Sequence, residues 1–237
     1  MIDEDAAADP KSIFIVENDE PTRQSLGWLL ESSGMTAETF ESGEAFLAAC
    51  QADRPGCLLV DVRLPGMSGV VLQEELARAG IRMPVIIMTG YADVGTAVRA
   101  LKGGAFDFLE KPLDSEMLLQ RVREALAFDG RCRRACAERE RLCARLARLS
   151  ARERAVFDQV VQGKANKVVA IEFGISEKTV EAHRARVMHK LGATSLAQLV
   201  RMDLAASQLE LLHILPIAPF GGAAFEAHSA TGSQVPA

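Results

Sequence analysis

A single carboxylate stands at the end of an apolar run, in a position suited to phosphoryl transfer. Cys57 to Val60 (CLLV) is apolar, Asp61 follows at once, and turn-forming residues lead on to Gly69. An apolar run of this length between turn signals predicts a strand buried on both faces. Such a strand presents its last residue at the carboxyl end of a sheet, where open α/β sheets hold their ligands. Because a carboxylate can form an acyl phosphate without a separate base, Asp61 is the candidate nucleophile.

Polar residues from other loops are expected to surround this carboxylate. Glu17 and Asn18 belong to the loop after a first candidate strand, Thr89 follows a fourth, and Lys111 follows a fifth. Loops after parallel strands meet at one edge, so these side chains should share a pocket with Asp61. Neighbouring negative charges need a hard divalent cation, which indicates Mg²⁺ held by Glu17, Asn18 and Asp61. Lys111 and the Thr89 hydroxyl would bind phosphoryl oxygens as they gain charge.

Five alternations of strand and helix in about 115 residues must position these side chains. The candidate strands cover residues 12–17, 36–40, 57–61, 84–88 and 107–109. Helical patterns lie at about 21–34, 42–49, 70–80, 93–102 and 114–128. This alternation predicts an α/β domain whose parallel sheet is covered by helices on both faces. The right-handed crossover rule favours a doubly wound, flavodoxin-like strand order.

Length and composition favour a two-domain globular protein. The chain has 237 residues, of which 49% are hydrophobic, so two small domains fit better than one. No apolar run reaches the roughly 18–20 residues of a membrane span, and the acidic N-terminus does not resemble a signal peptide. We therefore expect a cytoplasmic protein without a membrane partner. The five cysteines form no CxxC pair, which makes a disulfide framework improbable.

Charge divides the chain into two unlike parts. Residues 1–129 contain 22 Asp and Glu against 11 Lys and Arg, a net charge of −11. Residues 130–206 contain 8 against 16, a net charge of +8. An acidic part joined to a basic part is typical of a regulatory domain followed by a nucleic-acid-binding domain.

The basic part has the pattern of four short helices with a helix-turn-helix. Ser150 to Glu153 forms a capping box that opens a helix ending near Val161. Helices are also expected at 166–173, 177–191 and 196–205, and Gly174-Ile175-Ser176 is the tight turn between the second and third. On the third helix, Val180, Val187 and Leu191 form the face that should be buried.

The other faces of this third helix are available for DNA. The segment that contains this helix is similar to the LuxR-type DNA-binding domain, and the resemblance implies that the helix enters the major groove. Phosphates would then be held mostly by Lys167, Lys178, Thr179, Arg186 and Lys190. Base edges would be faced by Glu181, Ala182, Arg184 and Ala185. Glutamate can accept from cytosine, but Glu181 can equally orient Arg184. His183 and His189 are interpreted as packing or phosphate-side groups.

The acidic loop and the motifs VDVRLPGMSG and TGYADVGTAVRALKGGAFDFLEKP resemble the receiver domain of two-component response regulators over residues 12–126. The resemblance implies that a histidine kinase phosphorylates Asp61. It also implies that Thr89 and Phe108 form a switch pair and that the Lys111-Pro112 peptide is cis. The segment from LSARERAVFDQ to SLAQLVRM is similar to the LuxR-type DNA-binding domain, here residues 150–206. The two together resemble a FixJ-type response regulator, whose third basic-half helix enters the major groove.

One departure from the receiver pattern affects the metal. The family usually places two adjacent aspartates in the first loop, where this chain has Glu17 and Asn18. Asn18 offers an oxygen but no charge, so we expect weaker Mg²⁺ binding, with Asp19 as a candidate helper. The alternative is therefore a phosphate-independent regulator whose receiver serves for dimerisation or sensing. A phosphatase of the haloacid dehalogenase type is disfavoured because Arg63 stands where its acid/base aspartate would be, so no enzyme is expected.

Residues 127–149 are interpreted as a helical linker and residues 207–237 as a partly disordered tail. A stripe of the linker carries three cysteines, Leu142, Leu146 and Leu149. It fits either a helix that continues the receiver's last helix and packs on its own domains, or a short coiled coil between two chains. The thiols could bind metal or sense oxidation, but small apolar filler is favoured.

The function expected from these parts is regulated transcription. Without phosphate, the receiver should keep the DNA-binding half monomeric or occluded. Phosphorylation of Asp61 should favour a homodimer that binds paired half-sites in double-stranded DNA and activates transcription. The expected partners are a histidine kinase, DNA and RNA polymerase.

Overall fold

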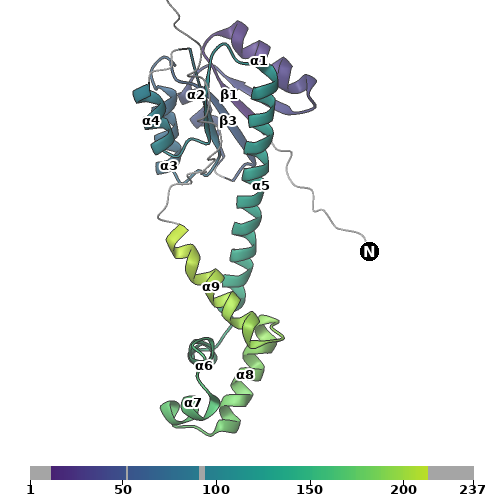
Figure 1. The fold of residues 1–237 in the computed structure, drawn as a ribbon, viewed down its shortest axis with the longest axis vertical. Helices are drawn as coiled ribbons and strands as arrows, with labels where there is room; N and C mark the ends of the chain where they lie inside the picture. The colour runs from purple at the N-terminus through teal and green to yellow at the C-terminus, as the bar shows by residue number, and fades with distance from the viewer. Residues whose placement is uncertain (1–11, 52, 91–93, 213–237) are drawn as a thin grey trace, which may run out of the picture.

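The structure is a computed structural model that describes residues 12–51, 53–90 and 94–212. It has a receiver-like α/β unit at one end and a small helical unit at the other, joined by one long helix (Figure 1). None of the helices in these ranges is long and apolar enough to cross a membrane.

The α/β unit is built on a five-stranded parallel sheet in the order β2-β1-β3-β4-β5. This order confirms the predicted flavodoxin-like fold. The strands are β1 (Ser12–Val16), β2 (Thr36–Phe40), β3 (Gly56–Asp61), β4 (Val85–Thr89) and β5 (Asp107–Glu110). The helices between them are α1 (Glu20–Ser32), α2 (Gly43–Ala49), α3 (Gly69–Arg78) and α4 (Val94–Lys102).

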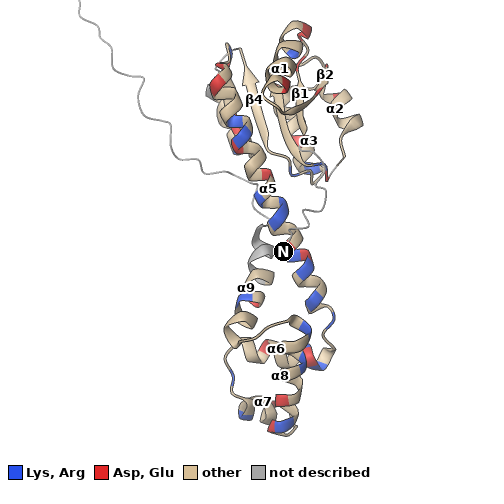
Figure 2. Ribbon diagram, turned by 90° about the vertical axis from the view of Figure 1, so that its right-hand side faces the viewer, with Lys and Arg blue, Asp and Glu red and all other residues tan. Residues whose placement is uncertain are grey.

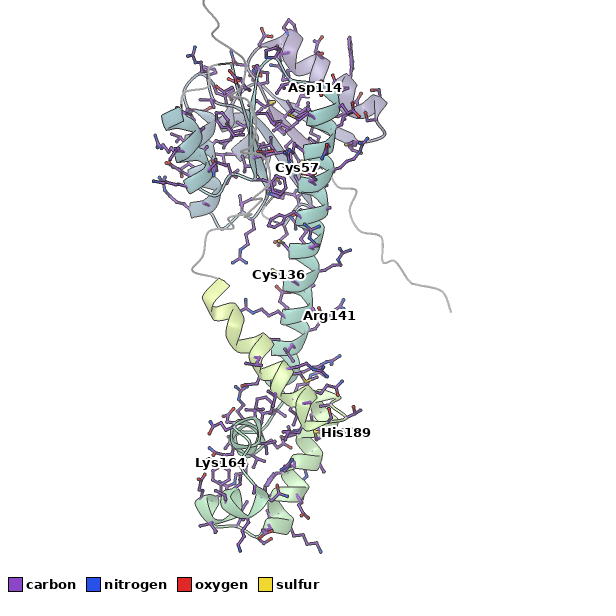
Figure 3. All side chains as sticks on the ribbon, in the orientation of Figure 1. Cys57, Asp114, Cys136, Arg141, Lys164 and His189 are labelled. Carbon is purple, nitrogen blue, oxygen red and sulfur yellow. The ribbon has the colours of Figure 1, made fainter. Side chains whose placement is uncertain are left out.

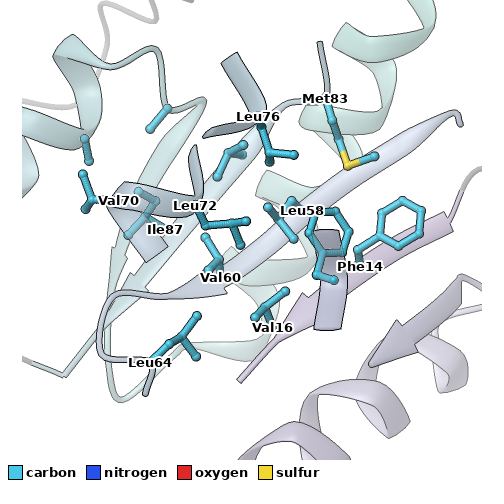
Figure 4. Close-up of a cluster of buried hydrophobic side chains, with 14 residues drawn as sticks. Phe14, Val16, Leu58, Val60, Leu64, Val70, Leu72, Leu76, Met83 and Ile87 are labelled. Atoms are coloured by element: carbon cyan, nitrogen blue, oxygen red, sulfur yellow. The ribbon is translucent and has the colours of Figure 1, made fainter. Parts of the chain in front are cut away.

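Two apolar layers hold helices on both faces of this sheet. Strand residues alternate between the layers, so Phe14 and Val16 lie in one and Ile13 and Ile15 in the other. The first layer packs against α2, α3 and α4 (Figure 4). The second packs against α1 and the first part of α5. Because both faces of the central strands are buried, the sheet holds the carboxyl ends of β1, β3, β4 and β5 in fixed positions.

The last helix of the α/β unit continues without a break into the predicted linker. α5 runs from Ser115 to Leu146, a helix of 32 residues. Leu142, Leu146 and Leu149 contact the core of the helical unit, which agrees with a helix packed on its own domains. A coiled coil between two chains stays a prediction.

The helical unit contains α6 (Ala151–Val161), α7 (Asn166–Phe173), α8 (Glu177–Leu191) and α9 (Leu196–Leu212). The predicted capping box of Ser150 and Glu153 is present. Gly174 adopts φ 63°, a left-handed conformation that favours glycine, in the turn between α7 and α8. Val180, Val187 and Leu191 are buried as predicted. α9 extends past the expected end near 205, because no glycine or proline interrupts the sequence before Leu212.

Candidate functional site

Asp61 is the last residue of β3 and is 5% exposed. Its Oδ2 accepts a hydrogen bond of 2.7 Å from the backbone N–H of Arg63. Its Oδ1 lies 2.7 Å from Nζ of Lys111. A side-chain carbon at Gly69 would lie 2.3 Å from the backbone oxygen of Asp61, so glycine is required where α3 begins. The carboxylate is thus held rigidly, with one oxygen on a cation.

Lys111 connects two carboxylates at the edge of the sheet. Its backbone N–H donates to the carbonyl of Thr89 at 2.6 Å, which fixes the residue beside β4. Its ammonium lies 2.7 Å from Asp61 Oδ1 and 2.6 Å from Glu17 Oε2. Burial by itself lowers the pKa of Lys111, but hydrogen bonds to the two carboxylates outweigh it and raise the pKa above its ordinary value. The Lys111-Pro112 peptide is cis, as the resemblance implied.

Glu17 is buried, and its loop is held from both sides. Its Oε1 accepts the backbone N–H of Asp19 at 3.2 Å. The guanidinium of Arg23 on α1 donates to the carbonyl of Glu17 at 2.7 Å and to the carbonyl of Asn18 at 3.3 Å. Sequence reasoning missed Arg23, because a single charged residue in the second turn of a helix gives no signal of this role.

Asp19 has a different role from the one expected. Its carboxylate accepts from the backbone N–H of Thr22 at 3.0 Å and from the Thr22 hydroxyl, and so caps α1. These hydrogen bonds lower its pKa. The side chain is therefore engaged at the helix terminus through Oδ2, and the suggestion that it helps to hold the metal stays a prediction.

The remaining receiver residues lie beside this pocket. Thr89 is 2% exposed and ends β4. Phe108 is half-buried on the neighbouring strand β5, packed against the first apolar layer. A switch that moves both residues stays a prediction.

The oxygen donors of the pocket suit a hard cation only in part. Two buried carboxylates, from Glu17 and Asp61, converge on Lys111, and the exposed Asn18 stands beside them. Within the described ranges, no group of three His, Cys, Asp or Glu side chains is arranged to hold a metal ion. The donor types fit Mg²⁺, with waters completing the shell, but the acidic charge is smaller than in a three-carboxylate site.

Most of the predicted DNA-contacting residues lie on the open face of α8 or at the start of α7. The exposed ones are Lys167, Lys178, Thr179, Glu181, Ala182, Ala185 and Arg186. Arg184 is half-buried and donates to the Asn166 side chain at 2.6 Å, so it links α8 to α7. His189 is exposed. The His183 Nδ1 is buried without a hydrogen-bond partner among the described residues.

Lys190, which was expected to contact phosphate, also makes an ion pair within the helical unit, and its phosphate contact stays a prediction. Its ammonium lies 2.6 Å from Glu153 Oε2 and 3.2 Å from the carbonyl of Arg148. The Glu153 side chain is 6% exposed, and its hydrogen bonds with Lys190 and Ser150 lower its pKa to about 2. Lys190 therefore joins α8 to the start of α6. A basic residue in the last turn of a helix looks the same in the sequence whether it faces DNA or a buried acid.

A buried acid on α5 was also missed. Asp129 is 1% exposed and accepts from the backbone N–H of Gly56 at 3.2 Å and from Arg133 Nε at 2.9 Å. Arg133 also donates to the carbonyls of Asp53 and Arg54, both at 2.6 Å. The signal was present, since Asp129 continues the buried stripe of Val122 and Ala125.

Comparisons with known proteins agree with this division of the chain. Residues 13–123 match the response regulator receiver domain, and residues 147–203 match the bacterial regulatory proteins of the luxR family. The transcriptional regulatory protein FixJ of Azorhizobium caulinodans is 46% identical over 82% of this chain and 92% of its own length. The C4-dicarboxylate transport transcriptional regulatory protein DctR of Rhodobacter capsulatus is 44% identical over 81% and 98%.

Two solved structures are similar over most of their length. The response regulator StyR has a TM-score of 0.74 and 36% identity, and the match covers 82% of this chain and 98% of StyR. Full-length FixJ from B. japonicum has a TM-score of 0.52 and 38% identity, with coverage of 84% and 98%.

Proposed function

This chain belongs to the FixJ-type two-component response regulators, with a receiver domain and a LuxR-type DNA-binding domain, and we propose that Asp61 is its phosphoacceptor. The observation that carries the proposal is the ammonium of Lys111, 2.7 Å from Asp61 Oδ1 at the carboxyl edge of the sheet. A cation fixed at this distance can bind the phosphoryl oxygens as charge develops on them.

The donor of the phosphoryl group is a phosphohistidine of a partner kinase. An oxygen of Asp61 attacks the phosphorus, the P–N bond breaks as the O–P bond forms, and the released imidazole takes a proton from water. Lys111 then neutralises the added charge, with the buried Thr89 hydroxyl as a second ligand to the phosphoryl oxygens. Glu17, Asn18 and Asp61 would hold Mg²⁺, which supplies further positive charge when bound.

Phosphate on Asp61 favours dimers that bind DNA at paired half-sites and activate transcription with RNA polymerase in the cytoplasm. The movement of Thr89 and Phe108 carries the signal to the surface of the receiver. α8 enters the major groove, with Glu181, Ala182 and Ala185 near base edges. Lys167, Lys178 and Arg186 bind phosphates.

Labelling with acetyl phosphate and Mg²⁺, followed on Phos-tag gels, tests the proposal. The wild-type chain should gain one phosphate and Asp61→Asn none, whereas Glu110→Gln, which changes an exposed carboxylate at the end of β5, should label like wild type. Equal labelling of the Asp61→Asn protein would rule out Asp61 as the acceptor.

A second candidate is a regulator that works without phosphate. It is favoured by the pairing of Glu17 with Lys111 and by the uncharged Asn18, which leave little acidic charge for a metal. In this case the wild-type chain would take no label at any Mg²⁺ concentration and would bind DNA equally with and without phosphodonor.

A further inference from the structure

The outward face of the linker part of α5 carries a row of arginines. Six exposed positions follow one another at alternating spacings of three and four residues; the first five lie on one face of α5, and the sixth lies in the turn just after the helix ends at Leu146. These positions are Arg131, Arg134, Glu138, Arg141, Arg145 and Arg148. Five of the six are arginine, and we call this row the arginine ridge.

These arginines make few contacts with other residues of the chain. Among the described residues, the side chains of Arg134, Arg141 and Arg145 make no hydrogen bond or ion pair, and Arg131 lies 5.9 Å from the ring of Phe128. By contrast, Arg133 on the inner side of the helix is fully engaged by Asp129 and two carbonyls. Like charges three and four residues apart repel each other on a helix, so the ridge costs stability unless a partner neutralises it.

The ridge lies on the same side of the molecule as the open face of α8. The labelled Arg141 on α5 and His189 on α8 lie along one side of the molecule in Figure 3, and Figure 2 shows several Lys and Arg positions along α5. The ridge also reaches the end of α8, since a side-chain carbon at Gly192 would lie 4.0 Å from Arg145 Nη1. The opposite stripe of α5 is directed inward, with Cys132, Cys136 and Cys143 lining a hollow.

We propose that the arginine ridge binds backbone phosphates of DNA that flanks the half-site contacted by α8, an inference that rests on the proposed DNA binding of α8. Guanidinium groups match phosphate oxygens in a bidentate geometry. Between Arg131 and Arg145 the helix rises about 21 Å, which is the length of about six base pairs. The linker is then part of the DNA-binding surface and adds sequence-independent affinity.

Other partners fit the ridge less well. Two copies of α5 cannot pair through it, because arginines would face arginines. A membrane surface requires an apolar face in the same helix, and the apolar face of α5 is already packed on its own domains. The acidic receiver of a second copy has a suitable charge, but it does not explain why the ridge and α8 share one side.

The experiment measures binding by fluorescence anisotropy as a function of salt concentration. The probe is a duplex selected from random 20-base-pair inserts by the wild-type full-length protein, used at its minimal core length and with ten base pairs added on either side. On the extended duplex, Arg141→Gln/Arg145→Gln should raise Kd about tenfold and reduce the magnitude of the log Kd against log salt slope by about 2. On the core duplex it should bind like wild type.

Three variants that each change a single charge serve as controls. Lys102→Gln removes one exposed positive charge from α4, away from the ridge, and should leave the salt slope unchanged on both duplexes. Arg141→Gln alone should reduce the magnitude of the slope of log Kd against log salt by about 1, and only on the extended duplex. Glu138→Gln removes the single negative charge of the ridge and should tighten binding to the extended duplex.

The outcomes separate this inference from the proposed function. If wild type and the double variant have the same Kd and the same salt slope on the extended duplex, the proposal that the arginine ridge binds DNA is overturned. It is also overturned by a double variant that only weakens self-association in sedimentation equilibrium, since the ridge would then bind the receiver of a second copy. If Lys178→Ala/Arg186→Ala binds core DNA like wild type, the proposed role of α8 fails while the ridge is judged on its own result. If the wild-type protein selects no duplex, the proposed DNA binding by α8 and the proposed DNA binding by the arginine ridge both fail.

Discussion

Lys111 holds Asp61 and Glu17 together with one ammonium group, at 2.7 and 2.6 Å. The proposed phosphoacceptor Asp61 and the acidic Glu17 are thus paired with a cation of the protein itself. Asn18, next to Glu17, supplies an oxygen without charge. Of the two loop positions that differ from the usual aspartates of the receiver family, Asn18 is the one that removes a negative charge from the proposed cation site.

Asn18→Asp should strengthen Mg²⁺ binding, because it adds a carboxylate to a site with two. We expect about a tenfold lower Mg²⁺ concentration for half-maximal acetyl phosphate labelling, on the scale of one further charged ligand. Gln24→Glu, which adds a charge to the exposed side of α1, is the matched control and should leave this concentration unchanged. An unchanged Mg²⁺ dependence in Asn18→Asp would exclude position 18 from the metal site.

The ion pair of Glu153 and Lys190 should make the stability of the helical unit depend on acid. The pKa of Glu153 is about 2 in the folded protein, below about 4.5 for an ordinary glutamate. A lowered pKa contributes stability above pH 4.5, and this contribution is lost as the pH falls toward 2. Glu153→Gln should therefore melt earlier than wild type at pH 7, and the difference should shrink below pH 4.5. Calorimetry of the full chain at pH 7 and below pH 4.5 checks this prediction. A difference in melting temperature between wild type and Glu153→Gln that stays the same at both pH values would contradict it.

At the scale of elements, α5 is anchored at both ends. Asp129 and Arg133 fasten it to residues 53–56 at the base of the receiver. Leu142 and Leu146 insert into the core of the helical unit. A continuous helix between two anchors transmits a rotation or shift of the receiver more directly than a flexible linker would.

Asp129→Ala should destabilise the receiver, because it leaves the Gly56 N–H without its acceptor and removes the carboxylate that pairs with Arg133, which keeps the carbonyls of Asp53 and Arg54. Leaving such a buried donor unsatisfied costs about 1–3 kcal/mol. Urea unfolding of the full chain measures this, with Glu140→Ala on the exposed side of α5 as a control of the same charge change. A loss no greater than that of the control would mean that the clamp contributes little.

At the scale of the whole molecule, α5 connects the receiver to the helical unit within the described residues. A conformational signal from Asp61 can therefore pass along α5 to α8. The proposed phosphorylation of Asp61 and the proposed DNA binding by α8 belong to units with separate hydrophobic cores. The receiver's two apolar layers and the helical unit's cluster share no residues among those described.

Ala137→Pro should uncouple phosphorylation of Asp61 from DNA binding by α8. Ala137 is exposed in the middle of α5, and proline there breaks the helix at a local cost of about 3 kcal/mol. Labelling of Asp61 should persist, whereas the gain in DNA affinity on phosphorylation should disappear. Ala137→Leu keeps the helix and should preserve the gain. A proline variant that responds like wild type would show that the signal does not pass through α5.

Local patterns in the sequence were enough to predict the order of elements and much of the site. Apolar runs, caps and turn residues act over a few positions, so β3 with Asp61, the capping box of Ser150 and Glu153, and the turn at Gly174 could all be identified. The meeting of Asp61, Thr89 and Lys111 followed from the parallel topology alone.

Which charged groups pair with each other was decided only by the tertiary structure. Glu17 and Lys111 are 94 residues apart, and Glu153 and Lys190 are 37 apart. Such pairs depend on how helices and strands pack, and a charge in the sequence looks alike whether it faces water, DNA or a buried acid. For this reason the sequence did not show that Asp19 caps α1 or that Lys190 pairs with the buried Glu153. Asp61 and its neighbour Lys111 were identified from the sequence, while the burial of Glu17 and its pairing with Lys111 required the fold.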